Sequence, residues 1–178
     1  MILETPRLIL RKMTQEDEPA LRLILQDPDV MYAYEGAFDD AEVHAWLHNQ
    51  LRRYEEEGCG LWAVELKGEP GLIGQCGITV QGIPDGDVME VGYLFQKEYW
   101  HQGYATEAAR ACRDYAFDEM HVDEVFSIIR DTNAASQGVA IRNDMTVRGR
   151  LVKHYRGVDM PHMIYSIRKD ERDELAQA

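Results

Sequence analysis

Hydrophobic and polar positions alternate at the start of this chain and then take up helical spacing. Arg7–Met13 alternates and is rich in strand-forming residues, so it predicts a first strand. Thr14 follows as a helix N-cap, with apolar residues at helical spacing after it. A second helix is predicted over residues 40–57, because its apolar positions share one face, and Gly58 is its C-cap. Residues 29–39 follow neither period, which indicates an irregular segment.

Three strand-like runs come next, over residues 61–67, 72–81 and 88–96. The separators are Gly68-Glu69-Pro70-Gly71 and Pro84-Asp85-Gly86-Asp87. Both are typical hairpin turn sequences, so the three runs predict an antiparallel meander.

A helix of unusually small apolar side chains follows over residues 104–118. Its stripe consists of Ala105, Ala108, Ala109, Cys112 and Ala116. Such a stripe lets a helix lie close to a sheet. A strand at 124–130, a short helix at 133–143 and a hairpin of 147–155 with 163–168 complete the pattern. The crossover between residues 88 and 130 implies one parallel strand pair. We therefore expect an α/β (α+β) fold, with a mixed, mostly antiparallel seven-stranded sheet and about four helices.

Length and composition indicate one globular domain over residues 1–178. Hydrophobic residues make up 45% of the chain and charged residues 29%, and no linker or repeat divides it. The three cysteines lack metal or redox spacing, and no signal sequence or long apolar run is present. We expect a cytoplasmic, reduced protein. His44 and His48 lack an intervening Glu and a third ligand, so no metal site is predicted.

The net charge of −13 restricts the partners. It repels nucleic acid and anionic lipid headgroups, so neither nucleic acid nor a membrane is expected as a partner. It attracts cations, which fits an amine or a basic protein as substrate. Solubility alone also explains the acidity.

The turn before residue 104 has the features of an anion site. The first N–H groups of a helix lack internal partners, and the helix dipole adds positive charge there. Gly103 permits close approach of the backbone, Ala105 leaves room, and Thr106 adds a hydroxyl. An ordinary helix start gives the same pattern. Neither a dinucleotide fingerprint nor a P-loop opens this helix.

The segment Tyr99–Ala108 (YWHQGYATEA) resembles the coenzyme-A-binding motif of GNAT acetyltransferases. It is most similar to the branch that contains the ribosomal-protein N-terminal acetyltransferases. Three further segments resemble that branch in the same order: Glu4–Arg11, Asn133–Ser136, and His154–Gly157 with Tyr165. The resemblance covers roughly residues 4–170.

The resemblance implies a GNAT fold and binding of acetyl-CoA. The sheet is then expected to splay between its fourth and fifth strands, 88–96 and 124–130. The pyrophosphate is expected at Gln102, Gly103, Tyr104, Ala105 and Thr106. The pantetheine arm is expected along the backbone of Tyr93, Leu94 and Phe95, with an amide near Leu94 or Phe95 on the thioester oxygen. Asn133 is expected to bond this arm, and Ser136 to lie near sulfur; both also suit an ordinary helix start.

Acetyl transfer needs a neutral amine, whereas free amines are mostly protonated at pH 7. A carboxylate can take that proton. Glu90, on the cofactor-flanking strand, is the first candidate, although it could equally pair across the sheet; Glu35 in the irregular segment is the second. Ser136 is expected as a weak donor to the thiolate. His101 and His162 are expected at the surface, with the acceptor site as the alternative position for each.

Two positions depart from the family pattern. Trp100 stands where the pyrophosphate motif has Gln or Arg, and Ala140 where many GNAT enzymes have a tyrosine general acid. The resemblance implies direct transfer to a primary amine in a ternary complex, with a protein N-terminal α-amine as the leading acceptor. A polyamine, amino acid or aminoglycoside is the alternative acceptor. A non-catalytic acyl-CoA sensor is the alternative function, and the protein is expected to be a monomer or homodimer.

Overall fold

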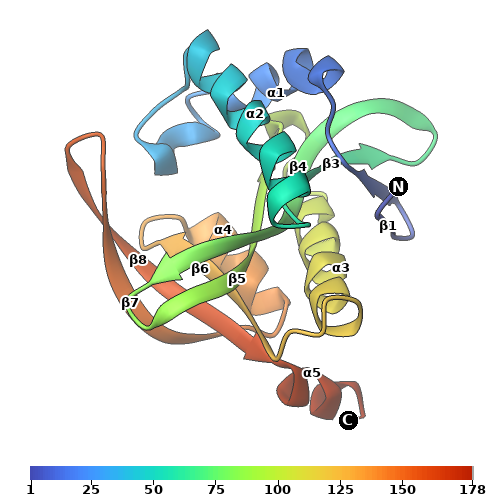
Figure 1. Ribbon diagram of the computed structural model, residues 1–178, viewed down its shortest axis with the longest axis vertical. Helices are drawn as coiled ribbons and strands as arrows, with labels where there is room; N and C mark the ends of the chain where they lie inside the picture. The colour runs from blue at the N-terminus through green and yellow to red at the C-terminus, as the bar shows by residue number, and fades with distance from the viewer. Residues whose placement is uncertain (178) are drawn as a thin grey trace.

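The computed structural model describes residues 1–177, in which eight strands form one sheet in the order β1-β2-β3-β4-β5-β6-β8-β7 (Figure 1). The strands are β1 (Leu3–Glu4), β2 (Leu8–Arg11), β3 (Leu61–Leu66), β4 (Glu69–Ile83), β5 (Gly86–Phe95), β6 (Glu124–Arg130), β7 (Thr146–Tyr155) and β8 (Val158–Arg168). Neighbouring strands are antiparallel except for β5 and β6, which are parallel.

Helices cover both faces of this sheet. The α-helices are α1 (Glu18–Leu25), α2 (Asp40–Glu56), α3 (Tyr104–Asp118), α4 (Ala134–Arg142) and α5 (Lys169–Ala176), and 3₁₀ turns are η1 (Gln15–Asp17), η2 (Met31–Tyr34) and η3 (Lys97–Tyr99). On one face, Trp46 of α2 donates from Nε1 to Gln75 Oε1 of β4 at 2.9 Å. On the other, Cys112 of α3 lies 3.6 Å from Cys76 of β4, sulfur to sulfur. Among the described residues, no helix is long and apolar enough to cross a membrane.

The predicted fold class and its mixed sheet are confirmed, and the structure adds one strand and one helix to the expected seven and four. Strand β1 has only two residues, too few to show a period. Helix α5 (KDERDELA) buries no residue, so it carries no apolar stripe for the sequence to reveal. Thr14 caps η1, which leads directly into α1.

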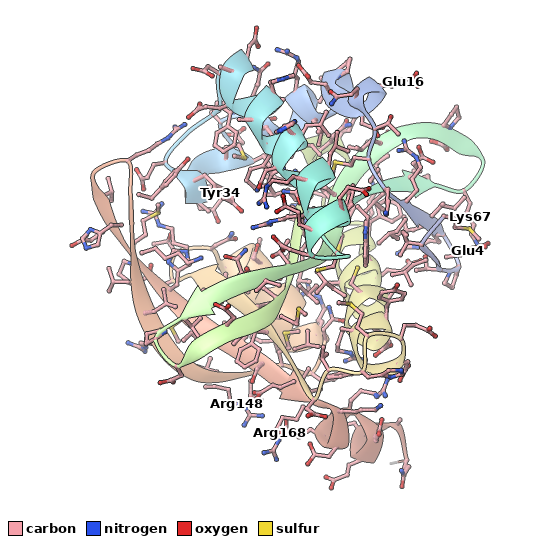
Figure 2. The ribbon with its side chains drawn as sticks, in the orientation of Figure 1. Glu4, Glu16, Tyr34, Lys67, Arg148 and Arg168 are labelled. Atoms are coloured by element: carbon pink, nitrogen blue, oxygen red, sulfur yellow. The ribbon has the colours of Figure 1, made fainter. Side chains whose placement is uncertain are left out.

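The small stripe of α3 lies against the sheet. Ala108, Ala109, Cys112 and Ala116 are buried, and the core continues into apolar side chains of β4, β5 and β6. Charged side chains such as Glu4, Lys67 and Arg148 lie at the edges of the molecule instead (Figure 2). The close packing of α3 fixes where its first turn lies relative to the end of β5.

The parallel pair β5–β6 is the splay that the family resemblance implies. Pairing between the two strands is recorded at Glu90 and Phe126. Beyond that point side chains bridge the strands: Ser127 Oγ donates to the carbonyl of Val91 at 2.8 Å, and the Ile128 amide donates to Glu90 Oε1 at 3.1 Å. The strands therefore diverge toward their carboxyl ends, which opens the sheet at the site described next.

Candidate active site

Two cavities, each of about 540 Å³, meet where β5 and β6 diverge. The first, here named the α3 cavity, lies between the end of β5 and the first turns of α3 and α4; Phe95, Trp100, Gly103, Thr106, Ala135 and Arg142 are among its lining residues. The second, the α2 cavity, lies between α2, the β4–β5 face and the β7–β8 hairpin; Trp46, Arg53, Thr79, Glu90, Lys153 and His162 help to line it.

The first turn of α3 presents unpaired amides to the α3 cavity. Gly103 is the N-cap with φ +84°, a left-handed conformation that favours glycine. Within residues 1–177, the amides of Tyr104, Ala105 and Thr106 have no recorded acceptor, and the first turn-closing bond runs from Glu107 N to Gly103 O. Three free donors at the positive end of a helix fit a diphosphate.

Glu107, a carboxylate in the same turn, is turned away from this cavity. Its Oε1 accepts from Thr5 Oγ1 at 2.6 Å, and its Oε2 pairs with Arg7 Nε at 2.6 Å. Burial raises the pKa of Glu107, but the bonds from Thr5 and Arg7 outweigh it, so the net pKa is lowered and the group stays ionised. Arg7 thus offsets the negative charge that would otherwise repel a bound anion.

Arg142 is a cation of the α3 cavity that the sequence analysis missed. Its Nε donates to Thr106 Oγ1 at 3.1 Å. A Cβ at Gly138 would lie 3.1 Å from Arg142 Nη1, so the glycine leaves room for the guanidinium. Ala135, Gly138 and Arg142 all line the cavity, and their spacing places them on one face of α4. The helical spacing of these three residues was the feature of the sequence from which this surface could have been predicted.

The end of β5 offers its main chain to the splay at alternate residues. The Val91 carbonyl points toward β6, because Ser127 donates to it. Alternation then turns the main chain of Tyr93 and Phe95 toward the same open edge, and that of Leu94 toward Gln75 of β4. Trp100 Nε1 donates to the Phe95 carbonyl at 3.0 Å. Trp100 therefore closes the end of this edge.

Among residues 1–177, Glu90 is the one carboxylate that lines the α2 cavity. It shares its face of the sheet with Thr79, its cross-strand partner, and with Gly92 and Leu94. Burial raises the pKa of Glu90, and Lys153, the Ile128 amide and Arg53 offset part of that rise. A buried carboxyl with a raised pKa suits a general base better than an exposed one.

Three sequence-predicted positions lie elsewhere than expected. Glu35 lines neither cavity: its Oε1 is 2.5 Å from Arg130 Nη1. Gln102 also lines neither; its carbonyl accepts from Arg7 Nη1 at 3.0 Å and its side chain donates to Glu98. His162 is buried in the α2 cavity, and its expected surface position is wrong, because β8 begins at Val158 and its alternation turns His162 inward.

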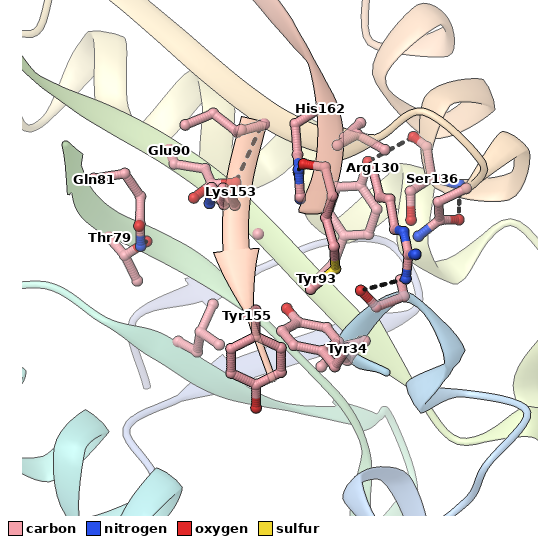
Figure 3. Close-up of a pocket in the computed structure, with 18 of the residues that line it drawn as sticks. Tyr34, Thr79, Gln81, Glu90, Tyr93, Arg130, Ser136, Lys153, Tyr155 and His162 are labelled. Carbon is pink, nitrogen blue, oxygen red and sulfur yellow. Dashed lines mark hydrogen bonds between the residues drawn. The ribbon is translucent and has the colours of Figure 1, made fainter. Parts of the chain in front are cut away.

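The two cavities share Val30, Tyr93, Leu94, Asn133 and Ser136. Asn133 caps α4 by accepting from the Ser136 amide at 3.1 Å, and the Tyr93 hydroxyl donates to the Ser136 carbonyl at 2.8 Å. Figure 3 shows Glu90 and Lys153 on one side of this junction and Ser136 on the other. Ala140 is buried and lines neither cavity. A molecule bound in one cavity can therefore contact a molecule bound in the other at this junction.

Comparisons with known proteins agree with this architecture. The family model for the acetyltransferase (GNAT) domain matches residues 7–146. YkkB, an uncharacterised protein of Bacillus subtilis, is 41% identical over 139 residues, which cover 78% of this chain and 81% of YkkB. A GNAT-family acetyltransferase structure from Bacillus anthracis has 25% identity and a TM-score of 0.82, covering 96% of this chain and 100% of its own. The structure of RimL, a ribosomal L7/L12 α-N-protein acetyltransferase in complex with coenzyme A, shares the fold with a TM-score of 0.78 at 17% identity, covering 96% of this chain and 98% of RimL.

Proposed function

This chain belongs to the GNAT acetyltransferase family, and we propose that it is an acetyl-CoA-dependent enzyme that acetylates a primary amine by direct transfer in a ternary complex. One observation carries the proposal: two cavities meet at Tyr93, Leu94, Asn133 and Ser136, with a helix N-terminus in one and a half-buried carboxylate in the other. Acetyl-CoA supplies an activated thioester, and transfer forms an amide and releases the free thiol.

The α3 cavity would hold the cofactor mainly through main-chain groups. The amides of Tyr104, Ala105 and Thr106 suit the pyrophosphate, and Arg142 adds a cation beside Thr106. The open strand edge at Tyr93 and Phe95 suits the pantetheine amides and the thioester oxygen, which supports these two main-chain amides over that of Leu94 in the proposal. Asn133 lies at the junction, where its side-chain amide can contact the same arm.

Glu90 is the proposed general base. A primary amine is mostly protonated at neutral pH, so one proton must leave before the nitrogen can attack. The raised pKa of Glu90 makes its carboxylate a stronger base than an exposed glutamate, and the Ile128 amide holds one of its oxygens in place. The other oxygen is the one available to the acceptor. This arrangement favours catalysis over a non-catalytic sensor role.

Ser136 is the proposed weak proton donor to the departing thiolate. It lies at the junction of the two cavities, on the first turn of α4. The Tyr93 hydroxyl holds this turn by donating to the Ser136 carbonyl, and burial raises the pKa of Tyr93, so its phenol stays neutral. A weak donor suffices because a thiolate is a good leaving group with a pKa near 8.5 for a free thiol.

The acceptor is either a protein N-terminal α-amine or a small-molecule amine. The resemblance to the ribosomal-protein N-terminal acetyltransferases favours the α-amine. The charges that line the α2 cavity favour a small-molecule amine, and we propose the small amine as the leading acceptor.

The test is thiol release from acetyl-CoA with panels of peptides and small amines. Turnover with at least one panel, lost in Glu90→Gln while calorimetric binding of coenzyme A persists, is the expected result. Binding of acetyl-CoA without turnover on any amine would favour a sensor. Absence of binding by well-folded protein would reject both.

We also infer a reducing, cytoplasmic location. Cys59, Cys76 and Cys112 are buried and free, although the last two lie 3.6 Å apart. Burial raises the pKa of Cys112, which keeps it in the unreactive thiol form. Mass spectrometry of alkylated protein from the native cell should find three free thiols.

A further inference from the structure

The α2 cavity has the opposite charge balance from the protein as a whole. The chain carries a net charge of −13, yet the cavity lining contains Arg53, Arg130 and Lys153 against the single carboxylate of Glu90 in the described residues. His154 and His162 also line it, and burial lowers the pKa of His162, so that ring stays neutral. The cavity is therefore a cationic enclosure inside an acidic protein.

The three cations differ in how far other carboxylates neutralise them. Arg130 Nη1 is paired with Glu35 at 2.5 Å. Arg53 has only a distant partner, Glu57, with Nε 3.8 Å from Oε1, and its buried Nε makes no hydrogen bond within the described chain. For Lys153, no ion pair is found among residues 1–177. Glu57 does not line the cavity, so within residues 1–177 Glu90 is the carboxylate that shares the cavity lining with Arg53 and Lys153.

Within the lining of this half-buried site, one carboxylate stands against two cations. Both cations favour the ionised form of Glu90, because each lowers its pKa against the effect of burial. Half-buried charges are screened less than exposed ones, so an excess of positive charge in the lining attracts an anion into the cavity and repels a second cation. The remaining wall is aromatic: Tyr34 and Phe38 pack edge-on against Trp46, with ring centroids 6.0 and 5.7 Å away.

We propose that the acceptor is a small primary amine that carries its own anionic group, with the amine at Glu90 and the anion at Arg53 and Lys153. This inference rests on the proposed N-acetyltransferase function and names its substrate class. Carboxylate and phosphate share the chemistry that the two cations recognise. Glu90 and Lys153 line the same cavity (Figure 3), and the charge of Lys153 lowers the pKa of Glu90, so one acceptor held there can contact both residues.

This inference separates acceptors that the total charge of the protein cannot. Polyamines and aminoglycosides bring further cations toward Arg53 and Lys153 and are disfavoured. A peptide N-terminus with neutral first residues has no anion near its amine and leaves both cations unpaired. An amino acid or a phosphorylated amino alcohol satisfies Glu90 and the cations together.

The first experiment compares matched acceptors by thiol release at saturating acetyl-CoA. Ethanolamine is paired with O-phosphoethanolamine, and propylamine with β-alanine; spermidine and a neutral tripeptide complete the panel. We expect kcat/KM at least about 10-fold higher for an anionic member than for its neutral partner. The phosphate and carboxylate arms identify which anion is preferred. Higher kcat/KM for spermidine or the tripeptide than for every anionic amine would overturn the inference.

The second experiment uses Lys153→Met and Arg53→Met. Each variant should lower the anionic-to-neutral ratio of kcat/KM about 10-fold. Because any effect on Glu90 acts on both acceptors, the ratio isolates the anion contact. Lys153→Arg should keep most of the ratio, and Arg148→Met, whose arginine pairs with Glu171 away from both cavities, should leave it unchanged. An unchanged ratio in both cavity variants rejects the anion subsite.

A binding measurement separates failure of this inference from failure of the proposed function. By calorimetry, the coenzyme A complex should bind O-phosphoethanolamine or β-alanine with higher affinity than ethanolamine or propylamine. Lys153→Met should remove this difference in affinity. If no amine is acetylated but this difference persists, the anion subsite stands and the catalytic proposal fails. If amines are acetylated and no difference is found, the anion subsite fails alone.

Discussion

The α3 and α2 cavities have the same volume, about 540 Å³, but they are built in different ways. The α3 cavity takes most of its lining from two continuous stretches, residues 93–106 and 133–142, and offers mainly main-chain amides. The α2 cavity collects side chains from η2, α2, β4, β5, β6, β7 and β8. A site made of main-chain amides, as proposed for acetyl-CoA, depends on the backbone and changes little when side chains are substituted. A site made of side chains, as proposed for the amine acceptor, can change its specificity by substitution while the fold stays the same.

The largest expected effect is in the α2 cavity. Glu90→Gln keeps the volume of the side chain and an acceptor for the Ile128 amide, but it removes the proposed base. We expect kcat to fall at least about 100-fold, since general bases contribute that much or more. Coenzyme A affinity, measured by calorimetry, should be unchanged because Glu90 does not line the α3 cavity.

Glu35→Gln tests the rival base. Glu35 lines neither cavity and pairs with Arg130, so this variant should lose far less activity than Glu90→Gln. A larger loss of activity in Glu35→Gln than in Glu90→Gln would indicate that Glu35, at the end of η2, is the base.

The next effect is expected in the α3 cavity. Gly103→Asp forces a side chain into a left-handed conformation and puts a negative charge at the helix start, so coenzyme A affinity should fall about 100-fold. Gly68→Asp is a matched control, because Gly68 has φ +83° and a Cβ there would meet nothing within 4 Å. Calorimetry should find normal affinity in Gly68→Asp; equal losses in both would indicate general damage to the fold.

A smaller effect is expected from Arg142→Gln. Loss of a cation beside Thr106 should weaken coenzyme A binding about 10-fold, and the difference from wild type should shrink at high salt. Arg148→Gln serves as the control for loss of one arginine charge. A salt-independent difference would mean that Arg142 acts by packing rather than by charge.

The smallest expected effect is a shift of the pH profile. Groups facing Glu90 include Lys153 from β7, Arg53 from α2 and Tyr34 from η2. As the proposed base, Glu90 must be ionised to act, so kcat/KM should rise with pH through its raised pKa. Lys153 lowers that pKa; Lys153→Met should therefore raise it and move the acidic limb to higher pH.

The profile is best measured with an acceptor that lacks an anionic group, such as propylamine, because such an acceptor does not depend on the anion subsite. Lys67→Met, which removes a lysine paired with Glu4 at the edge of the sheet, should leave the limb in place. A shift of the limb to lower pH in Lys153→Met would contradict the assignment of Glu90 as the base.

The periodic pattern predicted most elements of the fold because apolar spacing reports local burial. It missed β1, which has two residues, and α5, which buries none. In the site, the stretch from Gly103 to Thr106 lines the α3 cavity. Gln102 does not line it, because its carbonyl accepts from Arg7 and its side chain donates to Glu98. Arg7 and Gln102 are far apart in the chain, so no local pattern contains their contact.

The sequence by itself determined the helix-start turn at Gly103, because its chemistry depends on the backbone of a few consecutive residues. Only the tertiary structure decided the sign of charge in the α2 cavity. The total of −13 sums every side chain with equal weight, whereas the field at Glu90 depends on distance and burial. Arg53 in α2 and Lys153 in β7 are far apart in the sequence, and only the packing of the fold brings both to the cavity of Glu90.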